Sequence, residues 1–167
     1  MPLSMHDVSV PVFKQMLSGL SGIIDKAGAF AAVRKIDPNV ILGARLALDM
    51  FPFSRQVQLS SDHAKGAVAR LAGVEVPRYA DTEASFDELK ARIAKTADFI
   101  ERLDKAAFDG AETRPIVLTT GGRERTLPGQ TYFFSIALPN FYFHVTTAYD
   151  ILRHYGLEIG KRDFLGG

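Results

Sequence analysis

The sequence predicts an all-α fold, a four-helix bundle that carries one small β-hairpin between its third and fourth helices. Apolar residues recur at helical spacing in four long stretches, and a β-prone run ends at a Gly-Gly pair. A long connection that contains Pro77 separates the second and third stretches. The 167 residues suit one domain with a full core, so residues 1–167 are expected to form a single helical domain.

The first helix is expected from about Ser4 to Ala27. Its apolar residues recur every three or four positions, while polar residues occupy the opposite face of the helical wheel. Gly28 is expected to end it. The second helix is expected in two parts, because Asp37-Pro38 is typical of a helix start and opens a short helix through Leu48. Pro52 interrupts it, and a longer part runs from about Ser54 to Leu71.

The third helix follows Ser85-Phe86-Asp87-Glu88, a pattern that fits a capping box. Apolar residues keep a helical period behind it as far as about Ala107. Residues 115–127 change character, since Ile116 to Thr119 are β-prone and Gly121-Gly122 is a hairpin turn signal. A lone hairpin is marginal in water, so this one is expected to pack on the helices. The fourth helix is expected after Pro139-Asn140, ending at about Tyr155 before Gly156.

The connection from Ala72 to Ala84 bears on topology. A dozen extended residues reach about 40 Å, whereas a 20-residue helix is about 30 Å long, so the connection can cross the whole bundle. We therefore expect helices two and three to run parallel. The hairpin segment then returns the chain for a fourth helix that is parallel to the first.

Composition excludes several classes of function. The absence of cysteine excludes disulfides, zinc-thiolate sites and a cysteine nucleophile, so a metal would need His, Asp or Glu ligands. The 20 basic and 19 acidic side chains are interspersed, which makes nucleic acid an unexpected partner. No basic, then apolar, leader opens the chain, and no unbroken apolar run reaches the roughly 18 residues of a membrane span. The expected location is the cytoplasm, without membrane association.

The four histidines are the candidates for chemistry near neutral pH. On a helical wheel His144 lies within the apolar stripe of the fourth helix and His6 within that of the first, while His63 lies at a flank. If the first and fourth helices are parallel, His6 and His144 could meet at one end of the bundle. Each histidine could equally be a hydrogen-bonded core or boundary residue. Asp62 could line a cleft or be solvated, and Tyr149 could wall a pocket or belong to the core.

Three segments resemble the DUF1993 family. They are Asp49-Met50-Phe51-Pro52-Phe53 with Gln56-Val57, then Asp62 to Ala67, and above all Pro139 to Arg153; the tail Gly160 to Gly166 is similar too. The family is of uncharacterised function and is grouped with DinB/YfiT-like metalloenzyme bundles. The resemblance implies an up-down-down-up four-helix bundle, in agreement with the length of the connection after Ala72.

The resemblance also implies a metal site. Bundles of the DinB type hold a divalent metal, such as zinc or nickel, with one histidine from helix two and a His-x-x-x-His pair from helix four. The matching positions here are His63 and His144, but the third falls on Ala148, which cannot bind a metal. A catalytic zinc takes three protein ligands, so His6 or Asp62 would have to supply the missing one.

Three functions stay open at this point. The first is binding of a small molecule or a divalent metal at a pocket near His6, His63 and His144, with Asp62 and Tyr149 as further ligand-binding residues. The second is a noncatalytic homodimer in which the histidines are simply packed. The third is a metal-free acid-base enzyme that uses His144 against Tyr149 or Asp62.

Overall fold

The computed structural model of the chain describes residues 4–167. The fold is mostly helical, with one two-stranded antiparallel sheet. This confirms the predicted secondary-structure class, including a single hairpin before the last long helix.

Helix α1 spans Met5–Arg34 and is longer than predicted. Its start is as expected, because the Ser4 side chain caps it by accepting a hydrogen bond from the Asp7 N–H. Gly28 does not end it, since Ala27 and Ala31 continue the buried stripe on either side. The helix continues for nearly two more turns to Arg34 and stops at Lys35, which adopts a left-handed conformation with φ 54°. Tertiary packing therefore outweighed the local glycine signal.

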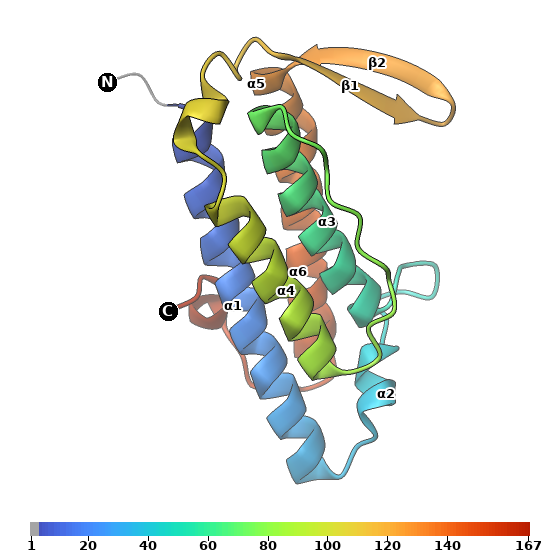
Figure 1. Cartoon of the computed structure of the whole chain (residues 1–167). Coiled ribbons are helices and arrows are strands. Elements are labelled where there is room, and N and C mark those ends of the chain that lie inside the picture. Colours follow the sequence, from blue (N-terminus) through green and yellow to red (C-terminus); the bar gives the residue numbers. More distant parts are fainter. Residues whose placement is uncertain (1–3) are drawn as a thin grey trace.

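Helices α2 and α3 replace the broken second helix. α2 is only Pro38–Leu42, shorter than predicted, because Gly43 caps it; α3 spans Phe53–Ala72, close to the expected bounds. The Asp37 side chain caps α2 as predicted, accepting from the Asn39 N–H at 2.9 Å. Residues 43–52 form a loop between the two helices that projects from the side of the molecule (Figure 1).

Helix α4 spans Phe86–Glu101 and is capped by the Ser85 side chain, as its sequence predicts. It ends six residues before Ala107, and a 3-10 turn, η1, follows at Lys105–Phe108. Strands β1, Pro115–Thr120, and β2, Arg123–Pro128, then form the expected hairpin. Gly121 and Gly122 both have positive φ, 58° and 75°, as the tight two-residue turn requires.

The last long helix begins earlier than predicted. A short helix α5, Gly129–Tyr132, leads through a π-helical turn, η2, at Phe133–Ala137 into α6, Leu138–His154. Pro139 has no N–H to bond to a carbonyl in the turn before it, and the wider π-turn lies just there. The proline is thus accommodated within a helical run instead of opening one. The tail forms α7, Lys161–Phe164, against α1.

The long helices α1, α3, α4 and α6 lie side by side (Figure 1), with contacts between α1 and α4, α4 and α3, α3 and α6, and α6 and α1. The linker 73–85 runs back along α3, so α4 begins near the end of the molecule where α3 begins. A single apolar core lies between the helices. Its largest fully buried side chains include Phe13, Phe53, Phe133, Phe141, Leu17 and Leu71.

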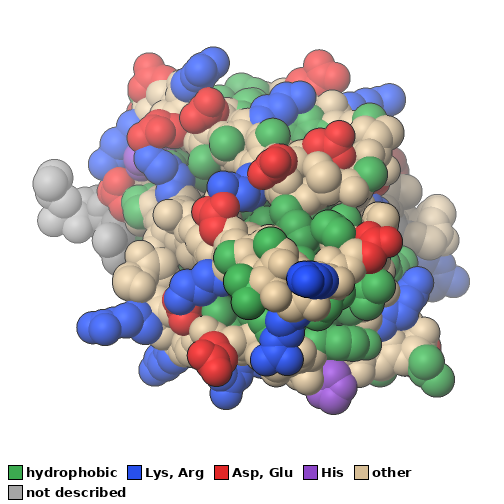
Figure 2. Space-filling view, turned by 90° about the horizontal axis from the view of Figure 1, so that it is seen from below, with side chains coloured by type: hydrophobic (Ala, Val, Ile, Leu, Met, Phe, Trp, Pro, Cys, Tyr) green, Lys and Arg blue, Asp and Glu red, His purple; other side chains and the backbone are tan. Residues whose placement is uncertain are grey.

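The surface of the molecule mixes charges of both signs. Viewed from below, Lys and Arg side chains lie among Asp and Glu, with hydrophobic side chains gathered toward the middle of that face (Figure 2). By length and mean hydropathy, 1.2 in its most apolar window, α1 also meets the criteria for a membrane span. In this structure its apolar stripe packs against α3, α4 and α6.

Candidate functional site

The structure brings His63 and His144 together between α3 and α6. Their rings stack with centroids 5.2 Å apart and an interplanar angle of 13°. Phe143 packs edge-on against His144, also at 5.2 Å. His144 is a buried residue and His63 a partly buried one, so the pair lies at the surface of the helix interface rather than deep in the core.

A glutamine fixes the tautomer of His144. The Gln56 amide nitrogen donates to the Phe51 carbonyl at 3.1 Å, which turns the amide oxygen toward His144. That oxygen lies 2.7 Å from His144 Nδ1, and an amide oxygen can only accept, so Nδ1 carries the proton and donates it. Nε2 of the neutral ring is therefore left with a lone pair. It can accept a hydrogen bond from a ligand.

Both imidazoles are held neutral at pH 7. Burial, then the neighbouring His63 and Arg55, lowers the pKa of His144 from 6.5 to about 4. Burial also lowers the pKa of His63; Arg70 and Lys65 add to this effect, while Asp62 opposes it. The charges that act on the pair are of both signs, since Asp62 raises the pKa of His63 more than either Arg70 or Lys65 lowers it, whereas Arg55 lowers the pKa of His144.

Gln56, His63 and Arg70 are spaced by seven and so lie on one face of α3, opposite α5 and α6. The Arg70 guanidinium folds back over Gly66, where an added Cβ would lie 2.7 Å from Nη1. It donates to the Tyr132 hydroxyl at 3.3 Å. Among residues 4–167, no carboxylate lies within ion-pair distance of Arg70. Among these residues Arg70 is therefore a cation without a carboxylate partner, two helical turns along α3 from His63.

The residues present do not fit the divalent metal that the family resemblance implies. Imidazole lone pairs lie in the ring plane, and two stacked, nearly parallel rings do not aim them at one point. His144 has already committed Nδ1 to Gln56, and Ala148 at the third ligand position is fully buried in the core. Within the part of the chain that the structure describes, no three His, Asp or Glu side chains form a group that could hold a metal. Zinc or nickel would also face two nearby arginines.

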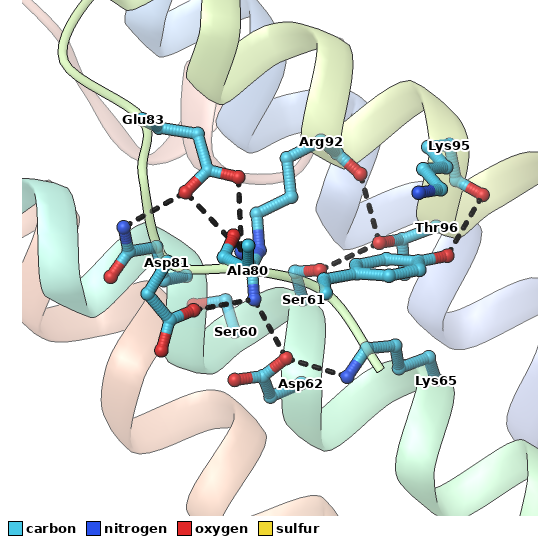
Figure 3. Close-up of polar contacts among 12 residues, drawn as sticks. Ser60, Ser61, Asp62, Lys65, Ala80, Asp81, Glu83, Arg92, Lys95 and Thr96 are labelled. Carbon is cyan, nitrogen blue, oxygen red and sulfur yellow. Dashed lines mark hydrogen bonds and ion pairs between the residues drawn. The ribbon is translucent and has the colours of Figure 1, made fainter. Parts of the chain in front are cut away.

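Asp62 belongs to a charged network (Figure 3). Its carboxylate accepts from Lys65 at 2.6 Å and from Arg92 at 2.8 Å. Arg92, with a side chain only 2% exposed, also pairs with Glu83 and Asp81 and donates to the Ala80 carbonyl. These partners come from α3, α4 and the linker 73–85. The network therefore ties the linker to both helices, and Asp62 is one of its members.

An aromatic ring completes this network. The Lys95 ammonium lies 4.2 Å, the Lys65 ammonium 4.7 Å and the Arg92 guanidinium 5.4 Å from the centroid of the Tyr79 ring. Beneath it the Ser61 and Thr96 hydroxyls bond at 2.6 Å. Arg92 Nε is the buried side-chain polar atom left without a partner in the described chain. The alternative prediction, that Asp62 is simply solvated, is therefore incomplete, because Arg92 binds its carboxylate.

His6 and Tyr149 have other surroundings. His6 lies in the first turn of α1, next to the Asp7 carboxylate at 3.3 Å and edge-on to Phe108 at 5.2 Å. Tyr149 packs edge-on against Phe164 of α7 at 5.7 Å. Neither contacts His63 or His144, so the structure does not gather the expected site residues at one end of the molecule.

A cavity of about 460 Å³ lies beside the start of α1. Met5, Val8, Phe108 and Phe134 line it together with Asp109, Glu112 and Gln130, but His6, His63 and His144 do not. The predicted site placed His6, His63 and His144 at one pocket, and of these the structure brings His63 and His144 together. The prediction missed Gln56, Arg70 and Tyr132, although the seven-residue spacing of Gln56, His63 and Arg70 was a usable signal.

Comparison with known proteins supports the resemblance seen in the residues. Residues 5–165 match the family model described as Domain of unknown function (DUF1993). A solved structure of a DinB family member protein from Shewanella denitrificans is 43% identical and superposes with a TM-score of 0.92. The match covers 98% of this chain and 92% of that one. No curated protein matches the chain.

Proposed function

Because the chain belongs to the DUF1993 family, whose function is unknown, we propose a role from its own site: it binds a small organic anion at His63 and His144. The scaffold for this role is an up-down-down-up four-helix bundle of the DinB type. That arrangement is supported by the ring of contacts among α1, α4, α3 and α6 and by the long linker between α3 and α4.

The observation that carries this proposal is the pairing of one free acceptor with one free cation. His144 Nε2 offers a lone pair, because Gln56 holds the proton on Nδ1. Arg70, two turns along α3 from His63, offers guanidinium donors that no described carboxylate occupies. An arginine fork suits a carboxylate or phosphate oxygen, and a neutral imidazole nitrogen suits a hydroxyl or amine donor. The ligand class is therefore an organic acid that also carries a hydroxyl or an amine.

A tightly held metal is the less favoured occupant. The imidazoles are neutral but stacked nearly parallel, and rings in that arrangement do not aim two lone pairs at one divalent cation. They do not oppose a carboxylate that pairs with Arg70. The solved relative is described only as a DinB family member, so its name adds no ligand to this argument.

The test compares ligands that differ by one group. Lactate carries both features, propionate lacks the hydroxyl, and 1,2-propanediol lacks the charge. We expect lactate and larger hydroxy or amino acids to raise the melting temperature and to bind by calorimetry, and the two truncated molecules to bind weakly. Removing one charge-assisted partner costs about 1.5–3 kcal/mol, so Arg70→Gln should weaken binding by roughly tenfold to a hundredfold.

Matched variants separate the site from the general charge of the protein. His144→Gln should lose binding as Arg70→Gln does, whereas Arg78→Gln, on the exposed linker, should leave it unchanged. Zinc and nickel are titrated alongside. Failure of every hydroxy and amino acid to bind, or one metal bound per chain and lost in His144→Gln, would refute the proposal.

A further inference from the structure

Leu48 is the most exposed large hydrophobic side chain described, at 99%. It lies on the loop 43–52, which projects from the side of the molecule between α2 and α3 (Figure 1). Scattered surface leucines are ordinary, but one held fully in water on a projecting loop makes no contribution to its own fold. The surface next to Leu48 indicates what this side chain contacts.

A groove lies next to this loop. It encloses about 410 Å³ and is lined by Leu46 and Met50 from the loop and by residues of the outer face of α6, namely Tyr142, Phe143, Thr146, Thr147 and Asp150. Phe143 is 55% exposed, and Phe51 beside the groove-lining Met50 is 54% exposed. The same patch of surface thus presents an apolar projection and an apolar hollow, which we call the Leu48 projection and the α6 groove.

We propose that the partner of this patch is a second copy of the chain, in a two-fold symmetric dimer in which each Leu48 enters the α6 groove of the other. A two-fold contact uses the same patch twice, so the patch must be complementary to itself. Projection and hollow meet that condition in shape. One charge pair meets it as well, because Arg45 on the loop is opposite in sign to Asp150, the one charged residue that lines the groove.

Charge complementarity favours a second copy over an unrelated partner. Arg45 donates to the Met50 carbonyl within its own loop, and within residues 4–167 it has no carboxylate partner. In the dimer Arg45 of one copy comes toward Asp150 of the other, and the symmetry repeats the pair. A patch of a single sign would repel itself, whereas this one carries both.

The dimer would also lie against the histidine pair. Phe143 packs on the ring of His144, and the Phe51 carbonyl orients Gln56. A second copy covering both phenylalanines would shield that edge of the site from water. The dimer itself does not depend on any ligand, so its test stands apart from that of the proposed function.

The experiment measures the mass of the full chain in solution by sedimentation equilibrium over a wide range of concentrations. The wild type is expected at twice the 18.3 kDa of one chain. Leu48→Asp should raise the dimer dissociation constant by at least about tenfold, as loss of a central apolar contact does. Val33→Asp is the matched control, since Val33 is 84% exposed on α1, and it should remain dimeric.

Cross-linking locates the contact. The chain has no cysteine, so Leu48→Cys and Thr146→Cys each introduce a single thiol. On mixing and mild oxidation, the mixed disulfide between the two variants should form faster than either homodimer. A monomeric wild type, a dimer unaffected by Leu48→Asp, or a mixed disulfide no faster than the homodimers would overturn the proposal. Circular dichroism checks that Leu48→Asp keeps the wild-type fold, as full exposure of the side chain predicts.

Discussion

Acidification should destabilise this protein through His144 well before its carboxylates titrate. In the folded chain the pKa of His144 is lowered from 6.5 to about 4, chiefly by burial. As pH falls below 6.5, the unfolded chain binds a proton at this position and the folded chain does not. Stability is therefore lost between about pH 6.5 and pH 4 and levels off below that range.

The magnitude follows from the shift. Each pKa unit corresponds to about 1.4 kcal/mol, and integrating over the interval from pH 7 to pH 4.5 gives about 2.4 kcal/mol. The ring edge keeps 9% exposure, so solvent offsets part of the penalty. We expect about 2 kcal/mol from this one residue.

The assay is urea unfolding, monitored by circular dichroism at pH 7 and at pH 4.5, for the wild type and for His144→Gln. Glutamine can still donate to Gln56 but cannot titrate. Contributions from the carboxylates are common to both proteins, so the difference between their pH effects reports His144 together with its coupling to the stacked His63. The variant should lose about 2 kcal/mol less than the wild type on acidification. An equal loss in both proteins, or a His144 ring signal that titrates near 6.5 by NMR, would show that burial does not hold this imidazole neutral.

Two further structural predictions concern the linker and the tail. Arg92→Leu should lower the free energy of unfolding by about 3 kcal/mol in urea, because Glu83 and the other carboxylates of the network lose their common partner. Lys95→Leu, on the exposed side of α4, should lower it by less than about 1 kcal/mol. Equal losses in the two variants would contradict the central role of Arg92. Gly19→Ala should destabilise by about 1–3 kcal/mol, since its Cβ would lie 2.6 Å from the Phe164 carbonyl oxygen of α7. Gly22→Ala, with open space around the added atom, should stabilise by about 0.5–1 kcal/mol, and a reversed order by thermal unfolding would contradict the docking of α7 on α1.

Local signals predicted the elements whose ends depend on local chemistry. The Ser85 cap, the Asp37 cap and the Gly121-Gly122 turn are confirmed because each depends on hydrogen bonds or φ angles within a few residues. The helix ends predicted from Gly28 and Pro139 were wrong, because contacts beyond the local sequence decided them. A buried stripe carried α1 past the glycine, and a π-turn admitted the proline into a continuing helix.

The candidate site was predictable in part. The family resemblance placed His63 and His144 at matching positions, and the structure stacks them. Their relation to His6, Asp62 and Tyr149 could not be read from helical wheels. A wheel gives the direction of a side chain from its own helix, but the depth along the neighbouring helix and the competing partners, such as Arg92 for Asp62, are set by packing.

What the sequence by itself determined is the family, the helical class, the hairpin and the two histidines that meet. Periodicity, caps and turn residues are short-range properties, and they survive in any arrangement of the elements. Only the tertiary structure decided that His144 donates to Gln56, that Arg70 binds Tyr132 and no described carboxylate, and that Leu48 projects next to a groove. Those features depend on side chains brought together from distant parts of the chain. Tautomer, pKa and surface complementarity depend on such neighbours, so they appear only when the helices are packed.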